Sequence, residues 1–157
     1  MMTTALRADL VTKMTKVLFV CTGNTCRSPM AEALFNHYTK DINNLCASSC
    51  GIYSDGVSQI SENAKRVLAE SGISFNHIST PISETLVKDA DYVVGMTANH
   101  AQNIMAMFPN YTDKVYTMPS DISDPYGGDI VVYRNCKKEI EEGVKILLKV
   151  LAGDDNG

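Results

Sequence analysis

The sequence places a cysteine and an arginine six positions apart in CTGNTCRS, residues 21–28, directly after an apolar run. A cysteine thiolate is a strong nucleophile, and an arginine fork can hold two phosphoryl oxygens while keeping its charge. Gly23 allows the backbone to turn its N–H groups inward, and a helix expected to begin at Ser28 adds the positive end of its dipole. We therefore expect a concave oxyanion site, in which Cys21 has a pKa well below that of a free thiol and Arg27 binds the oxyanion.

The residues around Cys21 favour catalysis over core packing. A lone cysteine at the end of a strand is most often a small core residue. Here Arg27 lies at a spacing that suits a phosphoryl site, and the Ser-Pro pair at 28–29 can open a helix. Ser28 is placed to donate a hydrogen bond to the sulfur, which would help Cys21 as nucleophile and later as leaving group.

A second loop carries a carboxylate, in the sequence DPYGG at residues 124–128. Pro125 fixes its own φ and restricts Asp124, and the two glycines that follow permit a sharp turn that aims the carboxylate into a cleft. An Asp-Pro pair in a loop is most often only a turn. When Cys21 attacks its substrate, the group that it displaces must receive a proton. A parallel sheet would bring this loop close to Cys21, so we expect Asp124 to donate that proton.

The elements that position these loops alternate between strand and helix along the chain. Such alternation predicts an α/β fold: one domain, a three-layer sandwich with a central, mostly parallel four-stranded sheet and helices on both faces. In such sheets the ligand lies outside the carboxyl ends of the strands, where Cys21 falls. Apolar spacing predicts strands at 16–20, 45–49, 91–96 and 114–118, and helices at 28–41, 58–71, 83–88, 97–108 and 130–151.

Length and composition limit the remaining possibilities. The chain has 157 residues, five cysteines and a formal net charge of −4. This length suits one domain, predicted at 14–153, with residues 1–13 as a disordered extension. The odd number of cysteines, without a secretory signal, favours reduced thiols in the cytoplasm. No apolar run is long enough to span a membrane, and no basic cluster suggests nucleic acid, so neither partner is expected.

The paired motifs CTGNTCRS and DPYGG resemble the low-molecular-weight protein tyrosine phosphatase family, over about residues 15–151. This resemblance implies that Cys21 attacks phosphorus to form a phosphocysteine. Asp124 would protonate the leaving group and then activate the hydrolytic water, while Arg27 holds the phosphoryl oxygens. No metal or other cofactor is implied. The expected substrate-binding residues are Thr22, Gly23, Asn24, Thr25, Cys26, Ser28 and Tyr126.

The resemblance also implies a polar network that holds the phosphate loop in shape. Its members here would be Asn24, Ser28, Ser49 and His77. The match is weaker at Cys50, where the family usually has alanine, and around His77, which lies in the divergent stretch NHIST and could be an ordinary loop histidine.

Cys26 lies inside the loop, five residues after the nucleophile. Many members of the family have a cysteine here that can trap an oxidised nucleophile as a disulfide, which prevents irreversible oxidation. The alternative is a passive small residue that fills the loop.

Thr25 bears on the substrate. Members that act on phosphotyrosine usually carry isoleucine or another apolar residue here, packed against the phenol ring. CTGNTCR with threonine resembles the bacterial protein-arginine phosphatase branch instead. The hydroxyl of Thr25 packs against an aromatic ring less well than an apolar side chain would, and it can form a hydrogen bond near the scissile P–N bond of phosphoarginine. Phosphoarginine in proteins is therefore the expected substrate, with phosphotyrosine as the alternative.

Two other classes of protein could share the phosphate loop. An arsenate reductase has a Cys-x5-Arg loop but resembles a relay that needs paired downstream cysteines, and this chain has none between Cys50 and Cys136. A non-catalytic phosphate-binding or phosphocarrier module would have little use for Asp124. The sequence therefore favours a hydrolytic enzyme.

Overall fold

Four parallel strands form the centre of the molecule. The computed structural model describes the backbone of residues 14–156 and the side chains of residues 14–152, so the expected extension at 1–13 lies outside the described residues. The strand order is β2-β1-β3-β4, and every pairing is parallel. This confirms the predicted sheet. The strands are β1 (Thr15–Cys21), β2 (Leu45–Gly51), β3 (Tyr92–Gly95) and β4 (Val115–Thr117).

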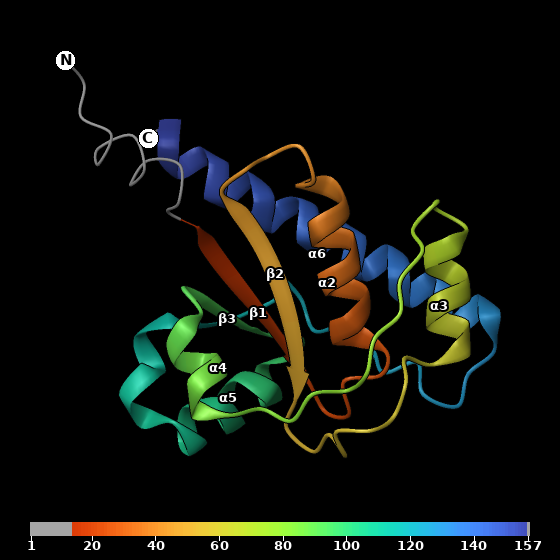
Figure 1. The fold of residues 1–157 in the computed structure, drawn as a ribbon, viewed down its shortest axis with the longest axis horizontal. Coiled ribbons are helices and arrows are strands. Elements are labelled where there is room, and N and C mark those ends of the chain that lie inside the picture. Colours follow the sequence, from red (N-terminus) through yellow and green to blue (C-terminus); the bar gives the residue numbers. More distant parts are fainter. Residues whose placement is uncertain (1–13, 157) are drawn as a thin grey trace.

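Helices cover both faces of the sheet, which confirms the three-layer sandwich (Figure 1). On one face lie α2 (Arg27–Tyr38), α3 (Glu62–Ala69) and α6 (Ile130–Asn156). On the other lie α4 (Glu84–Asp89), α5 (Ala98–Met107) and the 3₁₀ helix η1 (Pro109–Lys114). The loops that follow β1 and β4 leave the same edge of the sheet, because the strands are parallel.

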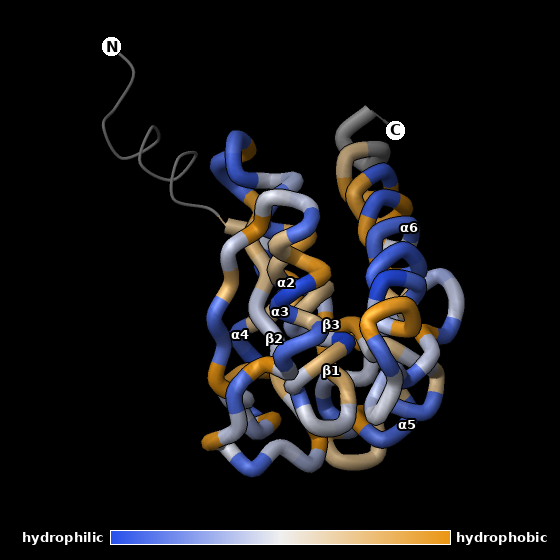
Figure 2. The backbone as a smooth tube through the Cα atoms, turned by 90° about the vertical axis from the view of Figure 1, so that its right-hand side faces the viewer, coloured by the Kyte–Doolittle hydropathy of each residue, from blue (hydrophilic) through white to orange (hydrophobic). Residues whose placement is uncertain are grey.

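Strand β1 is buried on both faces. Because successive side chains of a strand point to opposite faces, Phe19 and Cys21 pack toward α2, α3 and α6, whereas Leu18 and Val20 pack toward α4 and α5. This explains why the strand reads as a continuous apolar run in the sequence. Figure 2 shows hydrophobic and hydrophilic residues alternating along α6, as expected for a helix with one face on the core.

Helix α3 begins later than the sequence predicts. The periodicity predicts a start at Ser58, but the helix starts at Glu62. Asp55 accepts hydrogen bonds from the backbone N–H of Val57 and of Ser58, which holds this segment in a turn. Ser61 then caps the helix by accepting from the N–H of Ala64 at 3.2 Å. The Asp55 carboxylate therefore binds backbone N–H groups in a turn, and the helix begins only after that turn.

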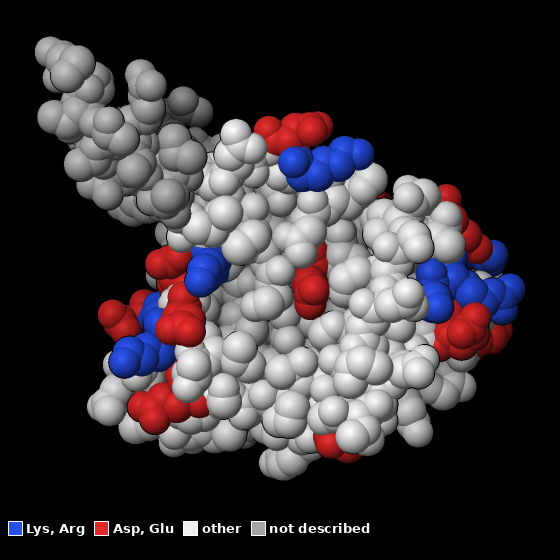
Figure 3. All heavy atoms as spheres, viewed as in Figure 1, with Lys and Arg blue, Asp and Glu red and all other residues white. Residues whose placement is uncertain are grey.

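No described helix is both long enough and apolar enough to cross a membrane. On the face drawn in Figure 3, Lys and Arg side chains lie beside Asp and Glu side chains rather than gathering into a broad basic surface.

Gly95 sets how closely α5 approaches β3. A Cβ at this position would lie 2.8 Å from the backbone N of Ala101 and 3.0 Å from the carbonyl O of Thr97. Since backbone atoms can yield only by moving the whole helix, Gly95→Ala should lower the free energy of unfolding by about 1–3 kcal/mol. Urea unfolding followed by circular dichroism measures this loss.

Gly143→Ala in α6 is the matched control. The nearest atom to its Cβ is the terminal methyl of Met118, at 2.5 Å, which can swing away. Alanine also favours the helix over glycine by about 1 kcal/mol. Equal losses in the two variants would contradict the argument from close backbone approach.

Candidate active site

The phosphate loop, residues 22–26, connects β1 to α2, and Cys21 is the last residue of β1. Its position depends on the segment after β2. The carbonyl O of Cys21 accepts from the N–H of Ile52 at 2.9 Å, and that of Thr22 accepts from the N–H of Tyr53 at 2.8 Å. The loop is therefore anchored to the neighbouring strand's end.

The turn of this loop depends on Asn24 and not on Gly23, which corrects the expectation from sequence. Asn24 has a φ of 59°, in the left-handed region that asparagine tolerates better than most residues. Gly51 is the glycine that the loop requires. A Cβ there would lie 2.7 Å from the carbonyl O of Thr22 and 2.9 Å from the backbone N of Asn24.

The sulfur of Cys21 is buried among hydrogen-bond donors. The residue is 3% exposed. Its Sγ lies 2.9 Å from Oγ of Ser28 and 3.3 Å from the backbone N of Asn24, which donates to it. Oγ of Ser28 accepts from Nδ2 of Asn24 at 2.8 Å, and its hydroxyl hydrogen has two acceptors within reach, the sulfur and the carbonyl O of Cys50 at 3.4 Å. The contact with the sulfur is the shorter one. Both donors stabilise a thiolate more than a thiol.

The pKa of Cys21 differs from the sequence expectation. Burial raises the pKa of the Cys21 thiol above its ordinary value, and the hydrogen bonds from Ser28 and Asn24 and the charge of Arg27 lower it by less. The predicted depression of the pKa is therefore wrong, because the sequence motif indicates the donors but not how completely the sulfur is removed from water.

Asn24 organises the polar network under the loop. It is fully buried, and its side chain makes four hydrogen bonds. Nδ2 donates to Ser28 and, at 3.0 Å, to Oγ of Ser49. Oδ1 accepts from the N–H of Thr80 at 2.8 Å and lies 2.7 Å from Nε2 of His77. The four residues that the resemblance assigns to this network thus lie together, and His77 faces Asn24.

Glu32 also belongs to this network, and the sequence analysis did not identify it. Ser49 donates to its Oε1 at 2.6 Å, and Nδ1 of His77 lies 3.9 Å from the same oxygen. Burial raises the pKa of Glu32 and lowers the pKa of His77, so both shifts favour the uncharged forms. A signal was present in the sequence: Glu32 lies four residues after Ser28, on the same face of α2.

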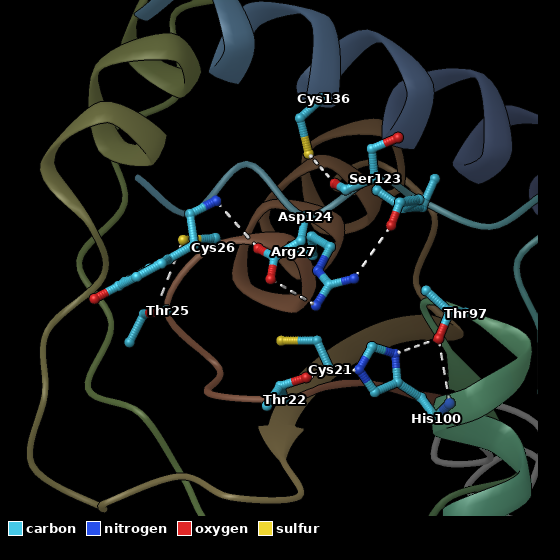
Figure 4. Close-up of polar contacts among 12 residues, drawn as sticks. Cys21, Thr22, Thr25, Cys26, Arg27, Thr97, His100, Ser123, Asp124 and Cys136 are labelled. Atoms are coloured by element: carbon cyan, nitrogen blue, oxygen red, sulfur yellow. Dashed lines mark hydrogen bonds and ion pairs between the residues drawn. The ribbon is translucent and has the colours of Figure 1, made fainter. Parts of the chain in front are cut away.

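Arg27 joins the phosphate loop to the loop that carries Asp124 (Figure 4). The arginine is 7% exposed. Its Nη2 lies 3.6 Å from Oδ2 of Asp124, and its Nη1 donates to the carbonyl O of Ile122 at 3.2 Å. A phosphoryl group held by this guanidinium would therefore lie beside the carboxylate.

Several contacts hold the Asp124 loop in place. The N–H of Ile122 donates to the carbonyl O of Met96 at 3.0 Å, and Oδ1 of Asp121 accepts from the N–H of Ala98 at 2.9 Å. The carboxylate of Asp124 itself is 57% exposed and accepts from the N–H of Tyr126 at 3.1 Å. The loop is therefore held by hydrogen bonds at Asp121 and Ile122, whereas the carboxylate of Asp124 is open to solvent.

A cavity of about 290 Å³ lies between the two loops. Tyr126 stands at its mouth, 83% exposed. Cys26 also borders the cavity although it is 6% exposed, and its Sγ lies 3.2 Å from the hydroxyl of Tyr133, a neighbour that the sequence analysis did not anticipate. All the predicted catalytic and substrate-binding residues except Ser28 line this cavity: Cys21, Thr22, Gly23, Asn24, Thr25, Cys26, Arg27, Asp124 and Tyr126.

The contribution of Ser28 to the thiolate can be measured directly. Ser28→Ala removes a donor at 2.9 Å from the sulfur, so the pKa of Cys21 should rise further. Alkylation of the Cys21 peptide by iodoacetamide, followed by mass spectrometry across pH, gives the midpoint. Ser83→Ala, which removes the exposed cap of α4, is the control. An unchanged midpoint in Ser28→Ala would mean that its hydroxyl does not support the thiolate.

Comparison with known proteins agrees with this geometry. A protein-arginine-phosphatase of Bacillus subtilis is 40% identical over 146 residues, which cover 88% of this chain and 97% of that protein. The low molecular weight protein-tyrosine-phosphatase PtpA of Staphylococcus aureus is 32% identical over 72% of this chain and 79% of its own. The solved structure of a YwlE arginine phosphatase variant with a phosphorylated active-site serine superposes with a TM-score of 0.86 at 38% identity, covering 89% of this chain and 97% of that chain. Residues 16–156 match the family described as low molecular weight phosphotyrosine protein phosphatase, and the chain belongs to that family.

Proposed function

We propose that this protein is a cysteine-dependent protein phosphatase that removes phosphoryl groups from phosphoarginine in proteins. The observation that carries the proposal is the convergence of Cys21, Arg27 and Asp124 on one cavity that Thr25 also lines. The similarity to a protein-arginine-phosphatase, at 40% identity over nearly the whole of that protein, supports the choice of substrate.

In the first step the sulfur of Cys21 attacks phosphorus. Because burial raises the pKa of this thiol, we propose that its proton passes to an oxygen of the dianionic phosphoryl group as that group binds. Thiol plus dianion and thiolate plus monoanion hold the same number of protons, and the second pair contains the better nucleophile. The S–P bond forms, the bond from phosphorus to the leaving group breaks, and Asp124 gives its proton to the leaving nitrogen.

In the second step Asp124, now a carboxylate, takes a proton from a water molecule that attacks the phosphocysteine. The P–O bond forms and the S–P bond breaks, which releases inorganic phosphate and returns Cys21 as a thiolate. Ser28 and the N–H of Asn24 donate to the departing sulfur. Arg27 holds the phosphoryl oxygens in both steps.

The other loop residues shape the phosphoryl site. Gly23, Thr25 and Cys26 line the cradle. The side chain of Asn24 is taken up by the network beneath the loop, and Ser28 links that network to the sulfur of Cys21. We therefore assign Asn24, Ser28, Ser49, His77 and Glu32 to support of the loop.

Phosphotyrosine is the second candidate substrate. Tyr126 stands exposed at the mouth of the cavity, where it could stack on a phenol ring, and the Staphylococcus aureus relative is a protein-tyrosine-phosphatase. Thr25 favours phosphoarginine, because its hydroxyl makes only a 3.8 Å contact with Sγ of Cys26 among the described residues and can hydrogen-bond to a guanidinium group.

We further propose that Cys26 acts as the resolving thiol when Cys21 is oxidised, since both border the same cavity. The five cysteines, which all fall within the described residues, are free thiols. A reducing compartment maintains cysteines in this form, so we place the protein in the cytoplasm.

Asp124→Ala should lower kcat by about 10² to 10⁴ for a phosphoarginine protein, the usual range for a lost general acid. The loss should shrink for p-nitrophenyl phosphate, whose leaving group hardly needs a proton. Turnover of both substrates with a metal chelator present measures the effect, and Asp129→Ala, a carboxylate further along the same loop, is the control. An equal loss on both substrates would make Asp124 structural.

Thr25→Ile should change the choice of substrate. An aromatic leaving group gains about 1 kcal/mol of packing, and a phosphoguanidinium group loses a hydrogen-bond partner at a cost of about 1 to 3 kcal/mol. The ratio of phosphotyrosine to phosphoarginine hydrolysis, measured as kcat/KM, should therefore rise at least about tenfold. Thr25→Ser, which keeps the hydroxyl, should leave the ratio near that of the wild type. If kcat/KM for the two substrates moves in parallel in Thr25→Ile, phosphotyrosine becomes the better assignment.

A further inference from the structure

His100 is a buried histidine that contacts the phosphate loop from α5, and the mechanism above does not use it. It is 4% exposed. Its Nε2 lies 2.9 Å from Oγ1 of Thr22, and its Nδ1 lies 2.9 Å from Oγ1 of Thr97 (Figure 4). The imidazole therefore bridges two threonine hydroxyls, one at the start of α5 and one directly after Cys21.

The hydrogen bonds of Thr97 determine which nitrogen of His100 carries the proton. Oγ1 of Thr97 caps α5 by accepting from the backbone N–H of His100 at 3.2 Å. In the described part of the chain, the acceptor within reach of the Thr97 hydroxyl hydrogen is Nδ1 of His100. If Nδ1 accepts, the single N–H of a neutral imidazole must be on Nε2, where it donates to Thr22.

The surroundings of the imidazole favour its neutral form. Burial lowers the pKa of His100 to about 4, and the charge of Arg27 acts in the same direction, while Asp124 and Asp121 oppose it. Near neutral pH the ring therefore has one donor and one acceptor, and the direction of each hydrogen bond is defined.

This arrangement fixes the direction of the Thr22 hydroxyl. Since Oγ1 of Thr22 accepts from His100, its hydrogen points away from the imidazole. Thr22 lines the cavity together with Cys21 and Arg27, and its carbonyl O accepts from the N–H of Tyr53. An oxygen that enters the cavity with the substrate is the acceptor that this hydroxyl can reach.

We propose that His100 is a positioning residue that holds the Thr22 hydroxyl as a hydrogen-bond donor to the bound phosphoryl group. The proposal rests on the proposed function only in taking a phosphoryl oxygen as the occupant. The opposite tautomer would make Thr22 donate to Nε2 and turn a lone pair toward the cavity. A lone pair would repel a phosphoryl oxygen, so the two arrangements predict opposite effects on oxyanion binding.

The tautomer is tested first, on the wild-type protein. Nitrogen NMR chemical shifts of the His100 ring distinguish a protonated Nε2 from a protonated Nδ1. We expect the proton on Nε2 near neutral pH. A proton on Nδ1 would overturn the proposal. This measurement needs no turnover, so it stands whether or not the enzyme proves to be a phosphatase.

Binding of inorganic phosphate, titrated by NMR, then tests the link between the two residues. Thr22→Val should raise the Kd about tenfold, because it removes one hydrogen bond to a charged acceptor, whereas Thr22→Ser should retain affinity. His100→Ala should raise the Kd by a similar factor in the wild-type background and by little in the Thr22→Val background. Asn99→Ala, an exposed neighbour on α5, is the control.

His100→Gln covers the case in which His100→Ala does not fold, because its amide N–H can donate to Thr22 and should restore part of the affinity. Equal losses from His100→Ala in both backgrounds would show that His100 does not act through Thr22. An unchanged Kd in Thr22→Val would show that the hydroxyl does not bind phosphate. Either result would overturn the proposal.

Discussion

A buried guanidinium joins the two loops that make up the candidate active site. Arg27 is 7% exposed, and a charge removed from water to this extent is costly unless it is paired and hydrogen-bonded. Its partners are the carboxylate of Asp124 and the carbonyl O of Ile122, both on the loop between β4 and α6. The position of Asp124, the proposed general acid, is therefore tied to the guanidinium that we propose binds the phosphoryl oxygens.

The phosphate loop shows the same dependence on what lies beneath it. The left-handed conformation of Asn24 turns the loop, and its four side-chain hydrogen bonds hold that turn against α2, β2 and the segment before α4. The same network places Oγ of Ser28 at 2.9 Å from the sulfur of Cys21. The sulfur is thus both desolvated and surrounded by donors. Desolvation raises the pKa of the thiol. In the proposed mechanism, the donors favour the thiolate once a phosphoryl group has accepted the proton.

The sequence predicts the sheet well because its central strands, β1 and β3, are short continuous apolar runs, as expected for strands buried on both faces. It predicts that Cys21, Arg27 and Asp124 converge because parallel strands end at one edge. It fails where a side chain nearby in the sequence decides the local backbone conformation. Asp55 delays the start of α3, and Asn24 makes the turn expected of Gly23.

Packing between distant segments explains the residues that the sequence does not reveal. Glu32 and His100 take part in the site only because folding buries them against Ser49 and Thr22. The pKa of Cys21 likewise depends on complete burial, which a loop motif does not specify. Local pattern predicts the chemical groups, and tertiary packing determines their protonation and hydrogen-bond direction.

The central claim is that Cys21 carries the phosphoryl group between substrate and water. Rapid acid quenching of the wild-type enzyme during turnover of a phosphoarginine protein, followed by mass spectrometry, tests it most directly. We expect one phosphoryl group on the peptide that contains Cys21, which appears and decays at rates consistent with turnover. Turnover without a phosphorylated Cys21 peptide, or with the phosphoryl group on another residue, would rule out a phosphocysteine intermediate at Cys21.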